Sequence, residues 1–275
     1  MRRFRLFRSH WRPEKRKNAR LSNSLCYDRT MESCTALVTA GSRGLGAEIV
    51  RTLARDGWDI ALTYLEDEEA AQSMVTEVEN MGRKAMMVQA DAADFPKAHA
   101  VIDAVMKKLG RLDALICNAG FARKGLLWEL SETDWDEVVD VCLKGAFNYL
   151  HAVAPHFIKQ QRGKVVAIGS INGLRARRST ASYNAAKAGL TGLIKAAAIE
   201  LGEHNVNVNL VAPGFIETPS QEHTPQSMRD LVLSECAIKR LGTPQDIAPV
   251  VAFLCSEQSK HITGQVIKVD AGQYI

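Results

Sequence analysis

Short apolar runs alternate with longer amphipathic stretches from about residue 35 to the end of the chain. The apolar runs are typical of buried strands, and they lie at about 35–39, 58–63, 84–89, 112–117, 163–169, 205–211 and 264–269. The stretches between them place apolar residues at helical spacing, and they lie at about 44–56, 68–81, 95–109, 133–160, 180–203 and 244–257. Strands that alternate with helices predict the α/β class, with helices on both faces of a parallel, doubly wound sheet. We therefore predict a single domain built on a seven-stranded parallel sheet.

The first strand runs directly into a glycine-rich turn, and a helical pattern follows the turn at once. A strand, a glycine turn and a helix in this order place a pyrophosphate on the N-terminus of the helix. Glycines let the backbone approach the phosphates without a Cβ in the way. The pattern predicts a Rossmann-like fold with a dinucleotide site. The expected phosphate-binding residues are Gly41, Ser42, Arg43, Gly44, Leu45 and Gly46.

The end of the second strand bears on the choice between NADP and NAD. A site for NAD usually has an acid there, which binds the 2′-hydroxyl of the ribose. This chain has Tyr64 and Leu65 at that point, and its first acid is Glu66. Arg43 offers a guanidinium to a 2′-phosphate. The sequence favours NADP(H), and NAD(H) stays the alternative because Glu66 or Asp67 lies close enough in sequence to bind a ribose.

Tyr183 and Lys187 lie four residues apart in a predicted helix, so they share one helix face. An ammonium beside a phenol stabilises the phenolate, and the phenol can then exchange a proton near neutral pH. Carbonyl reduction and alcohol oxidation both need such a proton. Ser170 follows the apolar run at 163–169, which places its hydroxyl at the carboxyl edge of the sheet. We predict that Ser170, Tyr183 and Lys187 are catalytic, because this second motif accompanies the glycine turn.

Further motifs follow in order along the chain, and the chain as a whole then resembles a known family. These motifs are Asp91-Ala92, Asn118-Ala119-Gly120, and residues 213–218, 239–248 and 262–272. From about Cys34 to its end the chain resembles the short-chain dehydrogenases/reductases, and within them the 3-oxoacyl-acyl-carrier-protein reductases. The motifs together are highly specific for the family and much less specific for a substrate.

The resemblance implies a role for each catalytic residue. Tyr183 gives a proton to the carbonyl oxygen of the substrate, and Ser170 hydrogen-bonds that oxygen. Lys187 binds the ribose hydroxyls next to the nicotinamide. The hydride comes from the cofactor, and the protein supplies position and electrostatics.

The resemblance also implies the rest of the cofactor site. Asp91 and Ala92 meet the adenine, while the backbone of Ile216 and the side chain of Thr218 hold the carboxamide. The remaining implied cofactor residues are Asn118, Ala119, Gly120, Tyr183, Lys187, Pro213 and Gly214. No metal site is expected, because the histidines show no metal-like spacing.

Three positions depart from the family pattern. Ala40 stands where the family has glycine, so it carries strain if that position needs a positive φ, unless Gly41 makes the turn instead. Cys117 replaces an asparagine before Asn118. Cys142 replaces the asparagine that in the family holds a water in a proton relay to the lysine, and a thiol is a weaker hydrogen-bonding group.

The predicted function is the NADPH-dependent reduction of a ketone to a secondary alcohol, as in the 3-oxoacyl-[acyl-carrier-protein] reductases of fatty acid biosynthesis. One alternative is a dehydrogenase of a sugar, a polyol or another secondary alcohol. An alternative of another class is an NADP(H)-binding interaction protein with weakened catalysis, which Cys142 and Ala40 favour. The expected partners are a small-molecule or carrier-bound ketone and further copies of the chain, in a homotetramer or homodimer as the family implies. Neither nucleic acid nor a membrane is expected as a partner.

The resemblance implies that residues 217–240 form a lid over the substrate, and long loops of this kind are commonly functional. A second segment on the substrate side carries Arg175, Arg177 and Arg178. These arginines are either contacts for an acidic carrier or a phosphate-bearing substrate, or ordinary surface charge.

The first thirty residues differ in composition from the rest. They hold eight Arg and two Lys against two acids, a net charge of +8, and the total of +4 leaves −4 for residues 31–275. We expect residues 1–32 to be a basic, disordered extension and residues 33–275 to be the dinucleotide-binding domain. The alternatives for the extension are an organelle transit peptide, electrostatic binding to nucleic acid or a membrane surface, and translation that starts at Met31.

Six cysteines are scattered without a C-x-x-C pair, and several lie in apolar runs, which indicates a reducing compartment. The expected location is the cytoplasm. No apolar run reaches the roughly 18 residues that a transmembrane helix needs.

Overall fold

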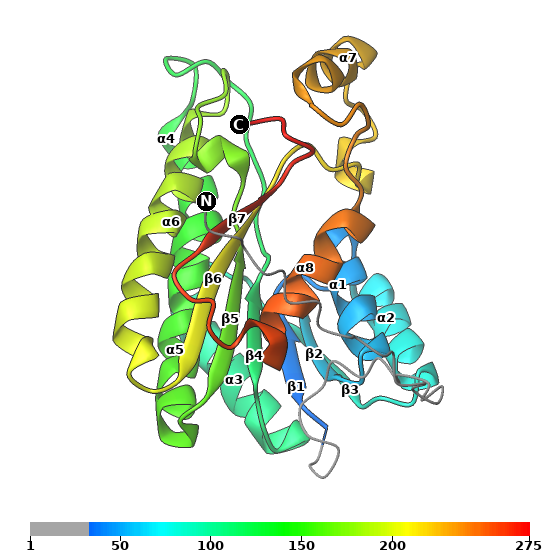
Figure 1. Cartoon of the computed structure of the whole chain (residues 1–275), viewed down its shortest axis with the longest axis vertical. Coiled ribbons are helices and arrows are strands. Elements are labelled where there is room, and N and C mark those ends of the chain that lie inside the picture. The colour runs from blue at the N-terminus through cyan, green and yellow to red at the C-terminus, as the bar shows by residue number, and fades with distance from the viewer. Residues whose placement is uncertain (1–32) are drawn as a thin grey trace, which may run out of the picture.

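The computed structural model describes residues 33–275, and the predicted extension at 1–32 lies outside the described residues. Its centre is one parallel sheet of seven strands in the order β3-β2-β1-β4-β5-β6-β7, which confirms the predicted α/β fold (Figure 1). The strands are β1 (Thr35–Val38), β2 (Asp59–Tyr64), β3 (Ala85–Gln89), β4 (Ala114–Cys117), β5 (Gly163–Ile168), β6 (Val206–Pro213) and β7 (Val266–Val269).

The strand order reverses at the centre of the sheet. β1 pairs with β2 on one side and with β4 on the other, both in parallel. The loops that leave the carboxyl ends of β1 and β4 therefore run to opposite faces of the sheet. In open α/β sheets the crevice at such a point is where ligands bind.

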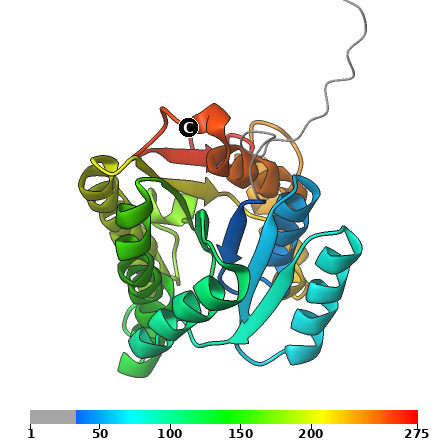
Figure 2. The same cartoon turned by 90° about the horizontal axis from the view of Figure 1, so that it is seen from below.

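Helices cover both faces of the sheet, as Figure 2 shows in a view from below. One apolar cluster joins the sheet to α1, α2 and α8, and the other joins it to α3, α5 and α6. The helices are α1 (Gly44–Arg55), α2 (Glu68–Asn80), α3 (Phe95–Leu109), α4 (Glu132–Val139), α5 (Gly145–Gln160), α6 (Ala181–Gly202), α7 (Gln226–Glu235) and α8 (Pro244–Cys255). Shorter helical turns are η1 (Asp140–Lys144), η2 (Ile171–Gly173), η3 (Pro219–Gln221) and η4 (Glu257–Ser259).

The central strands are buried on both faces, which is why they read as continuous apolar runs in the sequence. In β1, Ala36 and Val38 belong to the cluster under α1, α2 and α8, while Leu37 belongs to the cluster under α3, α5 and α6. All three residues are completely buried.

The long helix predicted at 133–160 is divided into three consecutive pieces. α4 is followed by a π-helical turn at Asp140–Lys144, and α5 then continues from Gly145. A π-turn adds a residue to one helical turn and is frequent at functional sites. Apolar periodicity does not reveal it, because helical spacing resumes after the turn. Cys142 lies within this turn.

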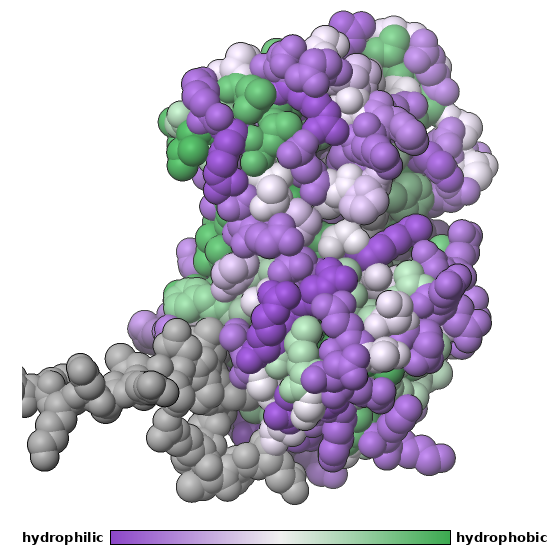
Figure 3. Space-filling view, turned by 90° about the vertical axis from the view of Figure 1, so that its right-hand side faces the viewer, coloured by the Kyte–Doolittle hydropathy of each residue, from purple (hydrophilic) through white to green (hydrophobic). Residues whose placement is uncertain are grey.

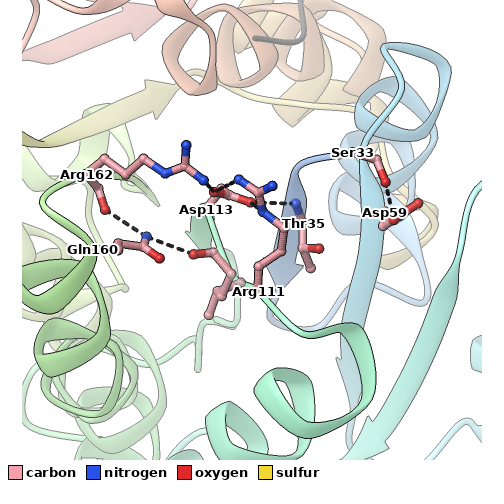
Figure 4. Close-up of polar contacts among 8 residues, drawn as sticks. Ser33, Thr35, Asp59, Arg111, Asp113, Gln160 and Arg162 are labelled. Carbon is pink, nitrogen blue, oxygen red and sulfur yellow. Dashed lines mark hydrogen bonds and ion pairs between the residues drawn. The ribbon is translucent and has the colours of Figure 1, made fainter. Parts of the chain in front are cut away.

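A polar network joins the amino ends of the strands, far from the crevice (Figure 4). Asp113 accepts hydrogen bonds from Arg111, from Arg162 and from the backbone N–H of Thr35. Asp59 accepts hydrogen bonds from Ser33 and Arg83 and from the backbone N–H of Lys84. These carboxylates satisfy otherwise unpaired backbone donors and fix the strands at the end opposite the crevice.

The surface on the side of α7, α1 and α2 is mostly hydrophilic, with an apolar patch at the upper left of the view (Figure 3). No helix within residues 33–275 combines the length and hydropathy needed to cross a bilayer.

Candidate active site

The turn after β1 shows which residue adopts the left-handed conformation. Ala40 has φ of 50°, so Ala40 makes the turn, whereas Gly41 does not have a positive φ. The left-handed region costs a residue with a Cβ roughly 1–2 kcal/mol. Ala40 therefore carries the backbone strain that the sequence left open. Hydrogen bonds from its neighbours hold this turn in place: the N–H of Ala40 donates to Thr63 Oγ1 (3.1 Å), and the N–H of Gly41 donates to the carbonyl of Thr63 (2.9 Å).

Two glycines in the turn are required for space. A Cβ on Gly41 would lie 2.8 Å from Leu62 Cβ, and a Cβ on Gly46 would overlap the carbonyl oxygen of Ala40 and lie 2.7 Å from Asn118 Nδ2. Gly44 begins α1 with φ of 57°, which favours glycine. Gly41 and Gly46 thus let β1, the turn and α1 pack closely together, while Gly44 supplies the left-handed backbone at the start of α1.

The N-terminus of α1 is open to an anion. Its N-cap residue, Arg43, makes no capping side-chain bond, and the first turn holds no acidic residue. Uncapped N–H groups and the helix dipole favour a phosphate at this position. The turn from Ala40 to Gly46, which we call the phosphate loop, therefore fits the pyrophosphate of a dinucleotide.

Asn118 and Thr39 tie the phosphate loop to the end of β4. Asn118 Nδ2 donates to the carbonyls of Thr39 (3.0 Å) and Ala40 (3.1 Å). Thr39 Oγ1 accepts from the N–H groups of Asn118 (2.9 Å) and Ala119 (3.0 Å). Thr39 and Thr63 were not among the site residues predicted from the sequence. The signal that could have found them is a hydroxyl at the carboxyl end of a buried strand.

Lys187 contacts the chain on both sides of Ser170. The Lys187 ammonium, on a side chain that is 3% exposed overall, donates to the carbonyl of Ile168 (2.7 Å), two residues before Ser170. On the other side, a Cβ on Gly173 would lie 2.6 Å from the Lys187 carbonyl carbon, so η2 packs against this turn of α6. Ser170 caps the N-terminus of η2, and its hydroxyl accepts from the N–H of Asn172 (3.1 Å). The serine loop and the middle of α6 are thus held together.

Tyr183 is half-buried one helical turn before Lys187, whose Nζ lies 5.6 Å from the centre of the phenol ring. A second phenol, Tyr149, is 1% exposed, and burial raises its pKa well above the ordinary value. A buried phenol of this kind gives up a proton with difficulty at neutral pH. Of the two phenols, Tyr183 is the one that is partly exposed to solvent.

Cys142 lies beside the same ammonium. A Cβ on Gly120 would lie 3.2 Å from Cys142 Sγ and 3.3 Å from Lys187 Nζ, so the thiol and the ammonium flank Gly120. The thiol donates to the carbonyl of Phe121 (3.3 Å). Burial raises the pKa of the neighbouring Cys117 thiol to about 12, which Lys187 opposes, so Cys117 is neutral at neutral pH.

The predicted adenine contacts follow β3. Asp91 is exposed, and one of its oxygens accepts from the N–H of Ala93 (2.9 Å). The carbonyl of Ala92 accepts from Asn148 Nδ2 (2.9 Å), and Asn148 is completely buried in α5. Asn148 therefore fixes the loop after β3, a role that the sequence did not reveal because the residue lies inside an apolar helix.

The predicted nicotinamide loop follows β6, which extends to Pro213. Gly214 is packed closely, because a Cβ there would lie 2.8 Å from Gln273 Oε1. Ile216 forms a bridge with Gly242. Thr218 lies beside the phosphate loop, since its Cβ is 3.8 Å from the place of a Cβ on Gly44. The structure thus brings the loops after β1 and β6 together at the carboxyl edge.

The three arginines on the substrate side have different surroundings. Arg175 pairs with Glu235 (2.6 Å), Arg177 contacts the sulfur of Met228, and Arg178 is exposed to solvent. No group of three or more His, Cys, Asp or Glu side chains suited to a metal occurs among residues 33–275.

The fold and this site define a nicotinamide-dependent oxidoreductase. The family model described as enoyl-(acyl carrier protein) reductase matches residues 39–273. The chain belongs to the short-chain dehydrogenase/reductase family.

Relatives with assigned activities cover nearly the whole described chain. A 3-oxoacyl-[acyl-carrier-protein] reductase of Staphylococcus aureus is 38% identical over 241 residues, which is 88% of this chain and 98% of the relative. The reductase of the same description from Thermotoga maritima is 37% identical over 245 residues, which is 89% and 99% of the two chains.

Solved structures of similar fold include enzymes with other substrates. A short-chain dehydrogenase from Burkholderia cenocepacia in complex with NADP has a TM-score of 0.82 and 34% identity, over 87% of this chain and 97% of its own. An acetoin dehydrogenase from Salmonella typhimurium has a TM-score of 0.81 and 34% identity, over 88% and 96% of the two chains.

Proposed function

We propose that the chain reduces the 3-oxo group of a carrier-bound acyl thioester to a secondary alcohol with NADPH. One observation carries the proposal: Lys187 contacts the chain both before and after Ser170, and Tyr183 lies one helical turn away on α6. The relatives of highest sequence similarity reported above are 3-oxoacyl-[acyl-carrier-protein] reductases, which supports this substrate class.

Each catalytic residue has a separate task in this proposal. The Ser170 hydroxyl hydrogen-bonds the carbonyl oxygen of the ketone and orients it. The Tyr183 hydroxyl donates a proton to that oxygen as negative charge develops on it. The Lys187 ammonium lies beside the phenol and stabilises the phenolate that the proton transfer leaves behind. When bound, NADPH supplies the hydride that reduces the carbonyl carbon.

The cofactor would lie along the carboxyl edge of the sheet. The residues that would hold its pyrophosphate are those of the phosphate loop, and Asp91 and Ala92 would meet the adenine. Asn118, Ala119 and Gly120 would line the middle of the site. Pro213, Gly214, Ile216 and Thr218 would meet the nicotinamide, and residues 217–240 would close over the substrate as a lid.

NADP is proposed over NAD because of the charges near the ribose. Arg43 is exposed at the start of α1 and forms no ion pair with any residue in the described range 33–275. Tyr64 ends β2 and Leu65 follows it, at the point where a carboxylate would otherwise bind the 2′-hydroxyl. The NADP complex of the Burkholderia cenocepacia dehydrogenase, a relative in structure, is consistent with this choice.

Arg43→Ala will weaken NADPH binding by about 30-fold and NADH binding by less than about threefold, because only NADPH has a phosphate for the guanidinium. Titration of both cofactors by fluorescence checks the prediction. Arg55→Ala, at the exposed far end of α1, is the control. An equal loss for both cofactors would mean that Arg43 does not bind the 2′-phosphate.

The assay that tests the function compares three substrates with the full chain: an acetoacetyl thioester, a crotonyl thioester and a secondary alcohol with NADP⁺. Oxidation of NADPH by the acetoacetyl thioester is the expected result. Turnover of the alcohol alone would favour the dehydrogenase alternative, to which the similar acetoin dehydrogenase lends support. Turnover of the crotonyl thioester alone would replace the proposed ketone with an enoyl substrate.

Tight NADPH binding without any turnover would favour the binding protein with weakened catalysis. Cys142 is the reason to consider it, because the thiol lies beside Lys187 and donates to the Phe121 carbonyl. Repeating the assay with Cys142→Asn would then show whether the thiol is responsible.

A homotetramer or homodimer is proposed from the outer face of α6. This long helix leaves a row of small and apolar residues exposed, which is unusual for a helix on a monomer surface. The row is Ala185, Ala188, Gly189, Gly192, Ala196 and Ile199. A cytoplasmic location is proposed as well, since Cys117, Cys142, Cys236 and Cys255, within the described residues, are buried thiols outside any disulfide.

A further inference from the structure

The end of the chain lies at the same end of the molecule as α7 (Figure 1). Residues 270–275, which we call the C-terminal tail, meet three segments that are distant in sequence. These segments are the loop after Ser170, the end of α7 and the nicotinamide loop after β6.

Gln273 is the centre of these contacts. It is polar but only 5% exposed, and both ends of its side-chain amide are hydrogen-bonded. Its Oε1 accepts from the N–H of Phe215 (3.1 Å), and its Nε2 donates to Glu235 Oε2 (2.8 Å). Its backbone carbonyl accepts from Arg175 Nη1 (3.2 Å). A buried amide that satisfies groups on three segments specifies their relative position.

Glu235 is the last residue of α7 and binds the other two side chains through one oxygen. Arg175 Nη2 donates to Glu235 Oε2 at 2.6 Å, and Gln273 Nε2 donates to the same atom. Burial acts to raise the pKa of this carboxyl, but the hydrogen bonds from Gln273 and Arg175 outweigh burial and lower it. The carboxylate is therefore charged at neutral pH, and the two hydrogen bonds that it accepts are charge-assisted.

Arg175 connects this pair to the serine loop. Its N–H donates to the carbonyl of Ile171 (2.8 Å), the first residue after Ser170. Its guanidinium lies 5.8 Å from the centre of the Tyr274 ring, and the Tyr274 hydroxyl donates to the carbonyl of Leu174 (3.4 Å). The tail thus holds the serine loop by two neighbouring residues.

We propose that Arg175, Glu235 and Gln273 form a positioning clamp that fixes the lid helix α7 and the nicotinamide loop relative to Ser170. The inference rests on the proposed function, in which the serine loop and the nicotinamide loop lie on two sides of one ketone. None of the three residues touches the reacting atoms, so they act through the loops that they hold. Without the Glu235 carboxylate, the guanidinium and the amide lose their common acceptor. α7 is then no longer tied to the other two segments, which stay joined through Gln273.

Loss of the clamp affects catalysis more than cofactor binding, because the phosphate loop is held by other contacts. Glu235→Gln will lower kcat for the ketone about tenfold, since small misplacements of aligned groups are costly. The Kd of NADPH will change less than about twofold. Arg175→Lys, which keeps a charged donor, will lose less activity than Arg175→Met.

The three residues also act as one unit. The double variant Glu235→Gln with Arg175→Met will lower kcat no further than the worse of the two single variants, because either substitution alone already opens the clamp. A fold-decrease in kcat equal to the product of the two single fold-decreases would overturn the proposal.

The experiment measures kcat, NADPH Kd and amide hydrogen exchange over residues 170–175 and 213–218 in native and variant full-length protein. Glu222→Gln is the matched control, because Glu222 is an exposed carboxylate on the same lid and forms no ion pair with the described residues. Faster exchange in both segments for Glu235→Gln, and not for Glu222→Gln, supports the clamp. Equal exchange in the two variants overturns it. If the native protein reduces no ketone, the proposed function fails and the exchange comparison alone decides on the clamp.

Discussion

Tyr183→Phe will lower kcat for ketone reduction by about 10³-fold, while the Kd of NADPH changes less than about threefold. The substitution removes one hydroxyl and keeps the ring, so the ring stays on its half-buried face of α6 near Lys187. The carbonyl oxygen then has no donor for the proton, although Ser170 still orients it. Steady-state kinetics with the acetoacetyl thioester and a separate NADPH titration check the two parts.

The control for this variant is Tyr149→Phe, which removes the other phenol close to the site. Tyr149 is buried, and its raised pKa makes it a poor acid at neutral pH. Its variant will keep kcat within about threefold of the native value. A Tyr183→Phe enzyme that retained a tenth or more of its activity would remove Tyr183 from the role of proton donor.

Gly46→Ala will weaken the binding of NADPH by at least about 100-fold, which is roughly 2.7 kcal/mol. The added Cβ would overlap the carbonyl oxygen of Ala40 and press on Asn118 Nδ2. These atoms cannot yield without moving the phosphate loop, because the Asn118 amide is bonded to that loop at 3.0 and 3.1 Å. Calorimetric titration with NADPH measures the loss, and circular dichroism shows that the domain is folded.

Gly202→Ala is the matched control for this change. Gly202 ends α6, and a Cβ there would meet nothing within 4 Å. Its variant is expected to bind NADPH as the native protein does. Unchanged affinity in Gly46→Ala would show that the pyrophosphate does not approach this part of the loop.

The sequence predicted the fold to within a few residues because the central strands are buried on both faces and so appear as apolar runs. The strand predicted at 112–117 begins later, at Ala114, and the one predicted at 205–211 continues to Pro213. These differences lie at strand ends, where hydrogen bonding rather than hydropathy sets the boundary.

Local features of the site were harder to predict. A positive φ at Ala40 depends on the contacts of the whole turn, and the sequence left open whether Gly41 would take it. The π-turn around Cys142 leaves helical periodicity intact on both sides. The ion pair of Arg175 joins residues 60 positions apart, so a row of arginines in the sequence did not show which of them is neutralised.

The bond between Asn118 and the phosphate loop has a consequence for how the protein folds. Its partners, Thr39 and Ala40, come 79 and 78 residues earlier in the chain. The loop is therefore completed only after β4 has docked beside β1, and that requires closure of a long intervening segment. During synthesis the first strand and helix leave the ribosome well before residue 118. A dinucleotide that binds the finished loop therefore binds only chains whose two half-sheets have already joined. Its binding raises the free energy of unfolding of the entire domain.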